Sequence, residues 1–178
     1  DGMRLQPCDR AADWEPLLYD YAEGLADGIN CAILMEASTG EVLFEKNADD
    51  RVSIASVTKI MTMLLIMERI ESGAMSFDEL VTVSDNAMSY GGSTMFLEAG
   101  EQLSVHDMLK GIAVASANDG CVAMAEHIAG SEANFVDMMN KRANELGMND
   151  THFVNTCGMH DDNHYTTAKD LSTLAQYA

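Results

Sequence analysis

The sequence predicts an α+β fold in which an antiparallel sheet packs against a helical lobe. Two short apolar segments, residues 31–35 and 41–45, flank a Ser-Thr-Gly turn signal at residues 38–40, which is typical of a β-hairpin. From residue 56 onwards, apolar residues recur at the spacing of amphipathic helices. Because two strands alone do not form a stable sheet, we expect the hairpin to need further strands.

The expected elements follow from capping residues and apolar spacing. A helix that is apolar on most of its surface is expected over residues 56–72, with Gly73 just past its end, and is interpreted as a central buried helix. Ser104 opens a second helix, with Asp107 as its capping-box partner. The other expected elements are a short helix over 15–25, a strand over 80–83, a helical turn over 84–88, and helices over 119–129, 131–146 and 167–178.

Composition and charge restrict the possible functions. The chain has 178 residues, enough for one domain with a sizeable core, and 10 basic against 29 acidic residues give a formal net charge of -19. Such a surface repels nucleic acid and anionic lipid headgroups, so neither is an expected partner. No stretch reaches the roughly 20 apolar residues of a membrane span. No signal peptide opens the chain, which indicates a cytosolic protein or a mature, processed form.

The residue types that bind metals give no strong pattern. The four cysteines, Cys8, Cys31, Cys121 and Cys157, lack the CxxC spacing of zinc sites. Free buried thiols are the simplest interpretation of these cysteines, and one disulfide is the alternative. The segment His-Asp-Asp-Asn-His at residues 160–164 could bind a metal, but we interpret it as a solvated polar loop. No cofactor or metal is therefore predicted.

The sharpest motif is Ser56-Val57-Thr58-Lys59, at the start of the predicted buried helix. Positions i and i+3 of a helix share a face, so the Ser56 hydroxyl and the Lys59 amine can meet. A lysine can take a proton from serine when its amine is neutral, a form that burial and a helix N-terminus favour. Backbone N–H groups at the same helix start can hold an oxyanion. The motif predicts Ser56 as nucleophile and Lys59 as general base; the alternative is an N-cap serine followed by a solvent-facing lysine.

A second motif, Ser116-Ala117-Asn118, lies between the second and third predicted helices, 60 residues after Ser56. A hydroxyl and an amide on such a loop can relay a proton and hold a substrate carbonyl, the roles that we assign to Ser116 and Asn118. The alternative is a helix C-terminus followed by a cap at Asp119. SxxK followed by SxN is the order used by penicillin-recognising serine enzymes.

Seven segments carry a wider resemblance. They are residues 32–43, 54–62, 92–97, 115–119, 151–155, 158–159 and 167–171. Over roughly residues 28–178 the chain resembles the serine-type D-alanyl-D-alanine carboxypeptidases, low-molecular-weight penicillin-binding proteins with the β-lactamase/transpeptidase-like fold. The resemblance implies that residues 28–178 are the N-terminal part of such a catalytic domain. Residues 1–27 are interpreted as a leader with a short helix.

The resemblance also implies a third motif, Lys-Thr-Gly on a later strand, which binds the substrate carboxylate. None of the five lysines here is followed by Thr-Gly. We therefore interpret the chain as truncated at its C-terminus, with the later sheet strands and the Lys-Thr-Gly motif missing. We expect those strands, or another chain, to cover the exposed sheet edge.

The implied activity is removal of the terminal D-alanine from peptidoglycan stem peptides ending in D-Ala-D-Ala, through an acyl-enzyme on Ser56. β-Lactam antibiotics would bind as mimics of that peptide, and the implied location is extracytoplasmic. Two rivals are a class A-like β-lactamase, whose second motif is Ser-Asp-Asn whereas residue 117 is Ala, and a non-catalytic penicillin-binding sensor or scaffold. A Ser-His-Asp triad is disfavoured, because no Gly-x-Ser-x-Gly elbow is present and Lys59 fills the base role.

Overall fold

The structure is a computed structural model that describes residues 26–178, so Cys8 and the short helix predicted over residues 15–25 lie outside it. The chain divides into two compact units, one ending at Ala48 and the other running from Asp49 to Ala178. Within the described residues, no helix combines the length and apolar character that a membrane crossing requires. The predicted boundary between residues 27 and 28 stays a prediction.

The first unit contains the predicted β-hairpin. Strands β1 (Ala32–Met35) and β2 (Val42–Lys46) pair antiparallel, with a register shift between Leu34 and Met35. The turn forms because the Glu36 carboxylate accepts hydrogen bonds from the Ser38 hydroxyl, at 2.8 Å, and from the backbone N–H of Thr39, at 2.6 Å. These bonds, the one from Ser38 first, lower the pKa of Glu36 to about 2. The hairpin prediction is confirmed.

The second unit begins with a tight turn that leads into its central helix. The 3-10 turn η2 (Ala55–Thr58) is followed by α2 (Lys59–Glu71), so the SxxK motif does not start a continuous α-helix as predicted. Ser56 lies in the narrower turn, and Lys59 is the first residue of the α-helix. A 3-10 turn at a helix N-terminus is common because its i to i+3 bonds use groups that an α-helix start leaves unpaired.

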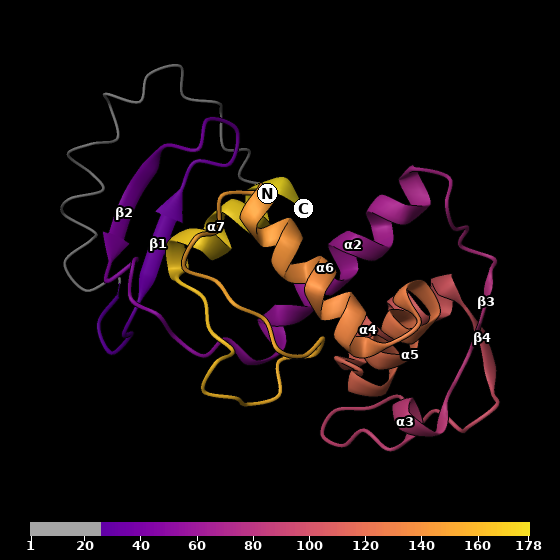
Figure 1. Cartoon of the computed structure of the whole chain (residues 1–178). Helices are drawn as coiled ribbons and strands as arrows, with labels where there is room; N and C mark the ends of the chain where they lie inside the picture. Colours follow the sequence, from indigo (N-terminus) through magenta and orange to yellow (C-terminus); the bar gives the residue numbers. More distant parts are fainter. Residues whose placement is uncertain (1–25) are drawn as a thin grey trace, which may run out of the picture. The chain divides into compact units, whose positions relative to one another are not determined.

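A small antiparallel pair of strands lies at one edge of this unit (Figure 1). Strand β3 (Leu80–Thr82) pairs with β4 (Gln102–Ser104), with Val81 opposite Leu103. The β3 strand and the short helix α3 (Asp85–Met88) were predicted, but β4 was not. Strand β4 has three residues, and its last residue is already the N-cap of the next helix. It is therefore too short to show the alternation of apolar and polar residues that marks a strand in the sequence.

Four further helices complete the unit, and three of them start after a residue whose hydroxyl caps the helix, as was predicted for Ser104. The Ser104 hydroxyl accepts from the Asp107 N–H at 3.1 Å, and the Ser131 and Thr167 hydroxyls cap their helices in the same way. The third predicted helix begins one residue earlier than expected, at Asn118. The helices are α4 (Val105–Ala115), α5 (Asn118–Ala129), α6 (Glu132–Glu145) and α7 (Ala168–Tyr177).

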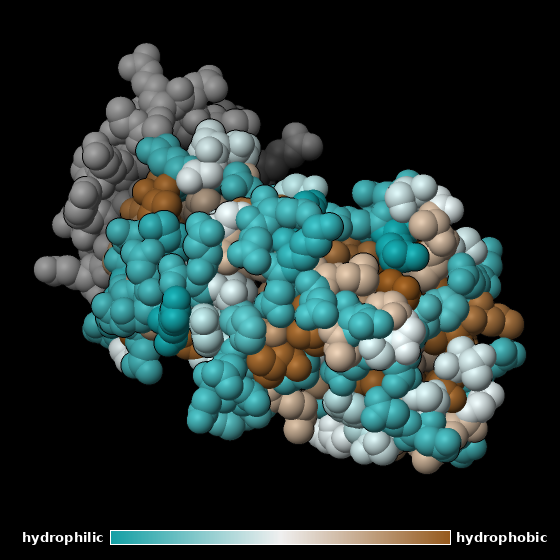
Figure 2. All heavy atoms as spheres, in the orientation of Figure 1, coloured by the Kyte–Doolittle hydropathy of each residue, from teal (hydrophilic) through white to brown (hydrophobic). Residues whose placement is uncertain are grey.

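The core of the second unit forms on two sides of α2, which confirms this helix as the central buried element. Ile66 packs with Met108 and Met124 in one cluster, whereas Met61 packs with Phe135 in the other. Each such fully buried side chain contributes about 1.5–3 kcal/mol to folding. Helix α2 contacts α4, α5, α6 and α7. On the face of the molecule shown in Figure 2, the surface is mostly hydrophilic, with smaller hydrophobic areas.

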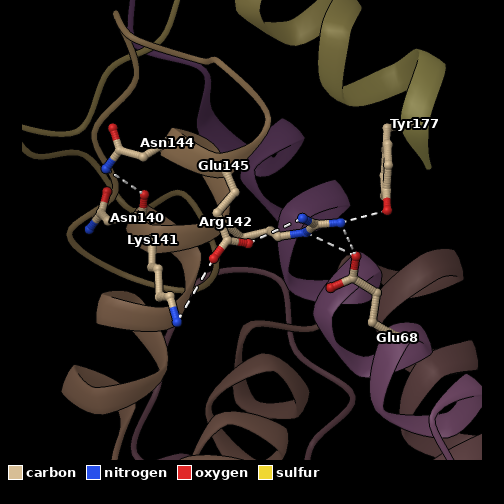
Figure 3. Close-up of polar contacts among 7 residues, drawn as sticks. All are labelled: Glu68, Asn140, Lys141, Arg142, Asn144, Glu145 and Tyr177. Carbon is tan, nitrogen blue, oxygen red and sulfur yellow. Dashed lines mark hydrogen bonds and ion pairs between the residues drawn. The ribbon is translucent and has the colours of Figure 1, made fainter.

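A polar cluster ties together the far ends of α2, α6 and α7 (Figure 3). Arg142 donates to the Glu68 carboxylate from Nη2, at 2.6 Å, and from Nε, at 3.0 Å. It also donates to Glu145 at 3.2 Å and to the Tyr177 hydroxyl at 2.6 Å, with the guanidinium over the Tyr177 ring. A planar guanidinium with several fixed donors suits this position better than an ammonium group.

We predict that Arg142→Lys lowers the free energy of unfolding by about 1–2 kcal/mol, because a lysine cannot bond Glu68 and Tyr177 together. Lys141→Gln is the matched control: Lys141 is exposed and reaches Glu145 only at 3.8 Å, so its loss should change stability by less than about 0.5 kcal/mol. Urea denaturation followed by circular dichroism measures both values. Equal effects of the two substitutions would contradict the prediction.

Candidate active site

Ser56 and Lys59 meet as their spacing predicted. The Lys59 Nζ atom lies 3.1 Å from the Ser56 Oγ atom and 2.8 Å from the carbonyl oxygen of Cys157. The Ser56 side chain is exposed, whereas Lys59 is only 3% exposed. An open hydroxyl thus stands beside a buried amine that has two oxygen partners. The alternative of a solvent-facing lysine is wrong.

The loop that supplies the Cys157 carbonyl also contacts the residue before Ser56. Gly158 has a φ of +87°, and a Cβ atom built on it would lie 1.8 Å from the carbonyl oxygen of Ala55. Only glycine permits so close an approach of two backbones. Ala55 itself has a φ of 45°, a left-handed conformation that is strained for a residue with a side chain.

Asn155 holds this loop in shape. Its Oδ1 atom accepts from the backbone N–H groups of Cys157, Gly158 and Met159, at 3.2, 2.7 and 3.1 Å. Its Nδ2 atom donates to the Met159 carbonyl at 2.9 Å. An asparagine that ties down the backbone following it is a recognised turn signal. Sequence reasoning found the resemblance of this segment but gave Asn155, Cys157 and Gly158 no role.

The thiol of Cys157 does not compete with Ser56 as a nucleophile. Burial raises the pKa of Cys157, and it raises the pKa of Cys121 as well, so both thiols stay protonated near neutral pH. Among the described residues, Cys31, Cys121 and Cys157 are free thiols. Cys121 and Cys157 are buried, as the simplest interpretation expected, whereas Cys31 is only partly buried.

The second motif lies at the junction of α4 and α5. Ser116 ends α4 in a left-handed conformation, with a φ of 55°, and its Oγ atom is buried with no hydrogen-bond partner within residues 26–178. Asn118 is the first residue of α5, and its backbone N–H donates to the Ser93 carbonyl at 2.8 Å. A buried hydroxyl without a partner is costly, so Ser116 is poised to bond a group that enters the site.

The side chain of Asn118 has one firm partner and one weak partner. Its Nδ2 atom donates to the Gly91 carbonyl at 2.8 Å and lies 3.7 Å from the sulfur of Met159. A thioether is a weak acceptor, so a carbonyl oxygen could replace it as the partner of this amide hydrogen.

Three consecutive loop residues bring the two motifs together. Cys157 bonds Lys59, Gly158 packs on Ala55, and Met159 touches Asn118. The 155–159 loop therefore borders both the SxxK turn and the SxN motif.

Asp119, the residue after the second motif, orders the segment in front of α5. This carboxylate is buried and accepts from the backbone N–H groups of Met95, Leu97 and Gly120, at 2.9–3.2 Å. Between the bonded residues, Phe96 has a φ of 60° and is almost fully exposed. The interpretation of Asp119 as a simple cap is therefore wrong, because its side chain bonds a distant loop in addition to the N–H of Gly120.

The interpretation of residues 160–164 as a solvated polar loop is correct for residues 160–163 but wrong for His164. Residues 160–163 form an exposed polar stretch, as expected, with His160 3.7 Å from Asp162. His164, in contrast, is buried and lies 2.7 Å from the hydroxyl of Thr58. The solvated-loop interpretation fails at this residue because its ring has two polar partners inside the protein, Thr58 and the N–H of Val154. No group of three metal-ligating side chains is present in the part of the chain that the structure describes.

Comparison with known proteins gives one consistent result. A family model described as D-alanyl-D-alanine carboxypeptidase matches residues 27–178. The D-alanyl-D-alanine carboxypeptidase DacF of Bacillus subtilis is 50% identical over 152 residues, which are 85% of this chain and 39% of that protein.

Two solved structures show the same fold. The D-alanyl-D-alanine carboxypeptidase DacD of Francisella tularensis is 41% identical with a TM-score of 0.82, over 83% of this chain and 36% of that one. Penicillin-binding protein D2 of Listeria monocytogenes, solved in the ampicillin-bound form, is 30% identical with a TM-score of 0.73, over 83% of this chain and 60% of that one. The predicted transpeptidase-like α+β fold is confirmed, and the chain spans less than half the length of DacF and DacD.

We predict that Gly158→Ala destabilises the protein far more than Gly147→Ala. Both glycines have positive φ, 87° and 80°, so each alanine pays the same conformational cost of about 1 kcal/mol. Only Gly158 faces another backbone, whereas Gly147 has nothing within 4 Å of the added atom. We expect at least about 2 kcal/mol of additional loss for Gly158→Ala in urea unfolding. Equal losses would show that the close approach to Ala55 is unimportant.

Proposed function

The chain belongs to the D-alanyl-D-alanine carboxypeptidase family, and we propose that it forms the part of such an enzyme in which Ser56 is acylated. The observation that carries this proposal is the 3.1 Å contact between the exposed Ser56 hydroxyl and the buried Lys59 amine. The proposed substrate is a peptidoglycan stem peptide that ends in D-Ala-D-Ala. Because peptidoglycan lies outside the cytoplasmic membrane, the proposed location of the protein is extracytoplasmic.

In the proposed acylation step, Ser56 Oγ attacks the carbonyl carbon of the penultimate D-alanine. The neutral Lys59 amine accepts the serine proton, and the Cys157 carbonyl keeps that amine within reach of Ser56. Negative charge develops on the peptide oxygen, and the backbone N–H of Ser56 is the proposed donor that stabilises it at the turn. The N–H of Val57 is already bonded to the Ile54 carbonyl, at 3.1 Å, and is not proposed for this role.

The second motif is proposed to assist departure of the terminal D-alanine. The unpartnered Ser116 hydroxyl is suited to pass a proton to the leaving amine, whose C–N bond breaks as the acyl-enzyme forms. Asn118 is proposed to hold a substrate carbonyl through the amide hydrogen that now faces Met159. Water then hydrolyses the ester on Ser56 and releases the shortened peptide. β-Lactams are proposed to acylate the same serine.

We predict that Ser56→Ala abolishes covalent labelling of the complete gene product by a fluorescent penicillin, because no other nucleophile occupies its place. Ser53→Ala is the matched control: Ser53 is also exposed and lies three residues earlier, so labelling should persist. Intact-mass measurement detects the adduct in each protein. An adduct that survives in the Ser56→Ala protein would contradict the assignment.

We predict that Lys59→Arg reduces the rate of acylation by about 10²- to 10⁴-fold, because a guanidinium stays protonated and cannot act as a base. Lys110→Arg, an exposed replacement beside Asp107, should leave the rate unchanged. Stopped-flow fluorescence with the same penicillin measures both rates. Near-normal acylation by the Lys59→Arg protein would point to another base.

Product analysis separates the proposed enzyme from its rivals. A carboxypeptidase releases D-alanine from a D-Ala-D-Ala peptide and turns over penicillin slowly, whereas a β-lactamase shows the reverse preference. A penicillin-binding sensor or scaffold forms the adduct and releases neither product. The Ala at position 117, in place of the Asp of Ser-Asp-Asn, favours the carboxypeptidase over the β-lactamase.

A further inference from the structure

His164 makes two hydrogen bonds inside the protein, and neither has a place in the chemistry proposed above. It is 2% exposed and lies in the segment that returns from the 155–159 loop towards α7. The backbone N–H of Val154 donates to its Nδ1 atom at 3.1 Å. Its Nε2 atom lies 2.7 Å from the Thr58 hydroxyl oxygen.

These two contacts determine the proton position on the ring. A backbone N–H can only donate, so the Nδ1 atom of His164 must carry a lone pair. The neutral ring therefore has its proton on Nε2, and this N–H donates to Thr58 Oγ1. If Nδ1 also carried a proton, its N–H would face the N–H of Val154, and the hydrogen bond between them would be lost.

Thr58 is well placed to pass this constraint to the reacting groups. Its side chain is fully buried, it immediately precedes Lys59, and it lies in the same 3-10 turn as Ser56. The 155–159 loop contacts Lys59 through the Cys157 carbonyl, and it contacts the backbone of Ala55 and Ser56 through Gly158. The hydrogen bond from His164 thus holds Thr58, which lies between Ser56 and Lys59 in the chain.

We propose that His164, as the neutral imidazole protonated on Nε2, is a positioning residue that holds Ser56 and Lys59 in reacting geometry through Thr58. The inference rests on the proposed acylation of Ser56, because that is the reaction whose geometry the residue maintains. A displacement of about 1 Å between a nucleophile and its base can reduce a rate by about 10²-fold.

The surroundings of His164 favour the neutral ring. Burial lowers the pKa of His164, Asp161 opposes this effect, and His152 adds to it. The Phe153 ring packs edge-to-face against the His164 ring, with centroids 5.7 Å apart. Because the folded-state pKa is depressed, the neutral ring stabilises the fold above about pH 6.5, and this contribution is lost as the pH falls through the lowered value.

Two amide substitutions separate the two bonds of the ring. In His164→Gln, the side-chain NH₂ takes the place of Nε2 and can still donate to Thr58. In His164→Asn, the shorter amide takes the place of Nδ1 and can bond Val154 but does not reach Thr58. Thr58→Val removes the acceptor while preserving shape. The measured quantity is the rate of Ser56 acylation by a fluorescent penicillin in the complete gene product, from pH 5 to 8.

We expect His164→Asn and Thr58→Val each to slow acylation at least about tenfold, and His164→Gln to stay within about threefold of wild type. The double variant His164→Asn/Thr58→Val should be no slower than either single variant, because each substitution removes the same hydrogen bond between His164 and Thr58. As the pH falls below about 6.5, the ordinary pKa of histidine, the wild-type rate should also decrease by a step that is absent from His164→Gln, because glutamine does not titrate.

Two results would overturn the proposal. One is a wild-type acylation rate in Thr58→Val, a substitution that keeps the branched shape of the side chain and so tests the bond even if His164→Asn fails to fold. The other is equal slowing by His164→Gln and His164→Asn, which indicates packing alone. A wild-type protein that takes up no penicillin contradicts the proposed function instead. In that case the imidazole ¹⁵N shifts decide whether Nε2 carries the proton, and a proton on Nδ1 overturns the inference.

Discussion

The hydrogen bond from Lys59 to the Cys157 carbonyl organises the second unit of this protein. A lysine amine that is 3% exposed is costly unless polar atoms surround it, and the chain offers it Ser56 on one side and this carbonyl on the other. The carbonyl comes from a loop 98 residues further along the chain. Asn155 fixes the shape of this loop, and Gly158 allows it to approach the Ala55 backbone closely. The position of the Lys59 amine therefore depends on the backbone of residues 155–159.

Backbone strain is concentrated at the two motifs. Four described residues other than glycine have positive φ, and two of them are Ala55, next to Ser56, and Ser116 itself. A third, Phe96, lies in the segment that Asp119 fixes. Such conformations cost about 1–3 kcal/mol each and persist where surrounding bonds outweigh them. The bonds from Asn155 and Asp119 to backbone N–H groups supply that constraint beside each motif.

Local signals predicted the helices and the hairpin, because caps and apolar spacing act over a few residues. Ser104 caps its helix as expected, and Ser131 and Thr167 cap helices at the starts that were predicted for them. Ser38 and Thr39 close the hairpin turn through Glu36. The contact of Ser56 with Lys59 was predictable for the same reason, since the two residues are three positions apart.

Contacts that join distant segments could not be predicted in this way. Strand β4 exists because β3, twenty residues earlier, lies beside it, and three residues show no period. His164 has an exposed polar stretch before it, and only its bond to Thr58, 106 residues away, explains its burial. Cys157 bonds Lys59 through its backbone carbonyl, a contact that a pattern of side chains in the sequence does not reveal.

The same long connections bear on how the protein acquires its site as the chain folds. Thr62 bonds the Thr156 carbonyl across 94 residues, Lys59 reaches Cys157 across 98, and Thr58 reaches His164 across 106. Closing loops of this length has an entropic cost that is recovered only when many contacts form together. During synthesis, a nascent chain that ends before residue 155 carries Ser56 and Lys59 without the 155–159 loop, and one that ends before residue 164 lacks the bond to Thr58. The bonds that fix Thr58, Lys59 and Thr62 in the folded protein therefore form only after residues 156–164 have joined the fold.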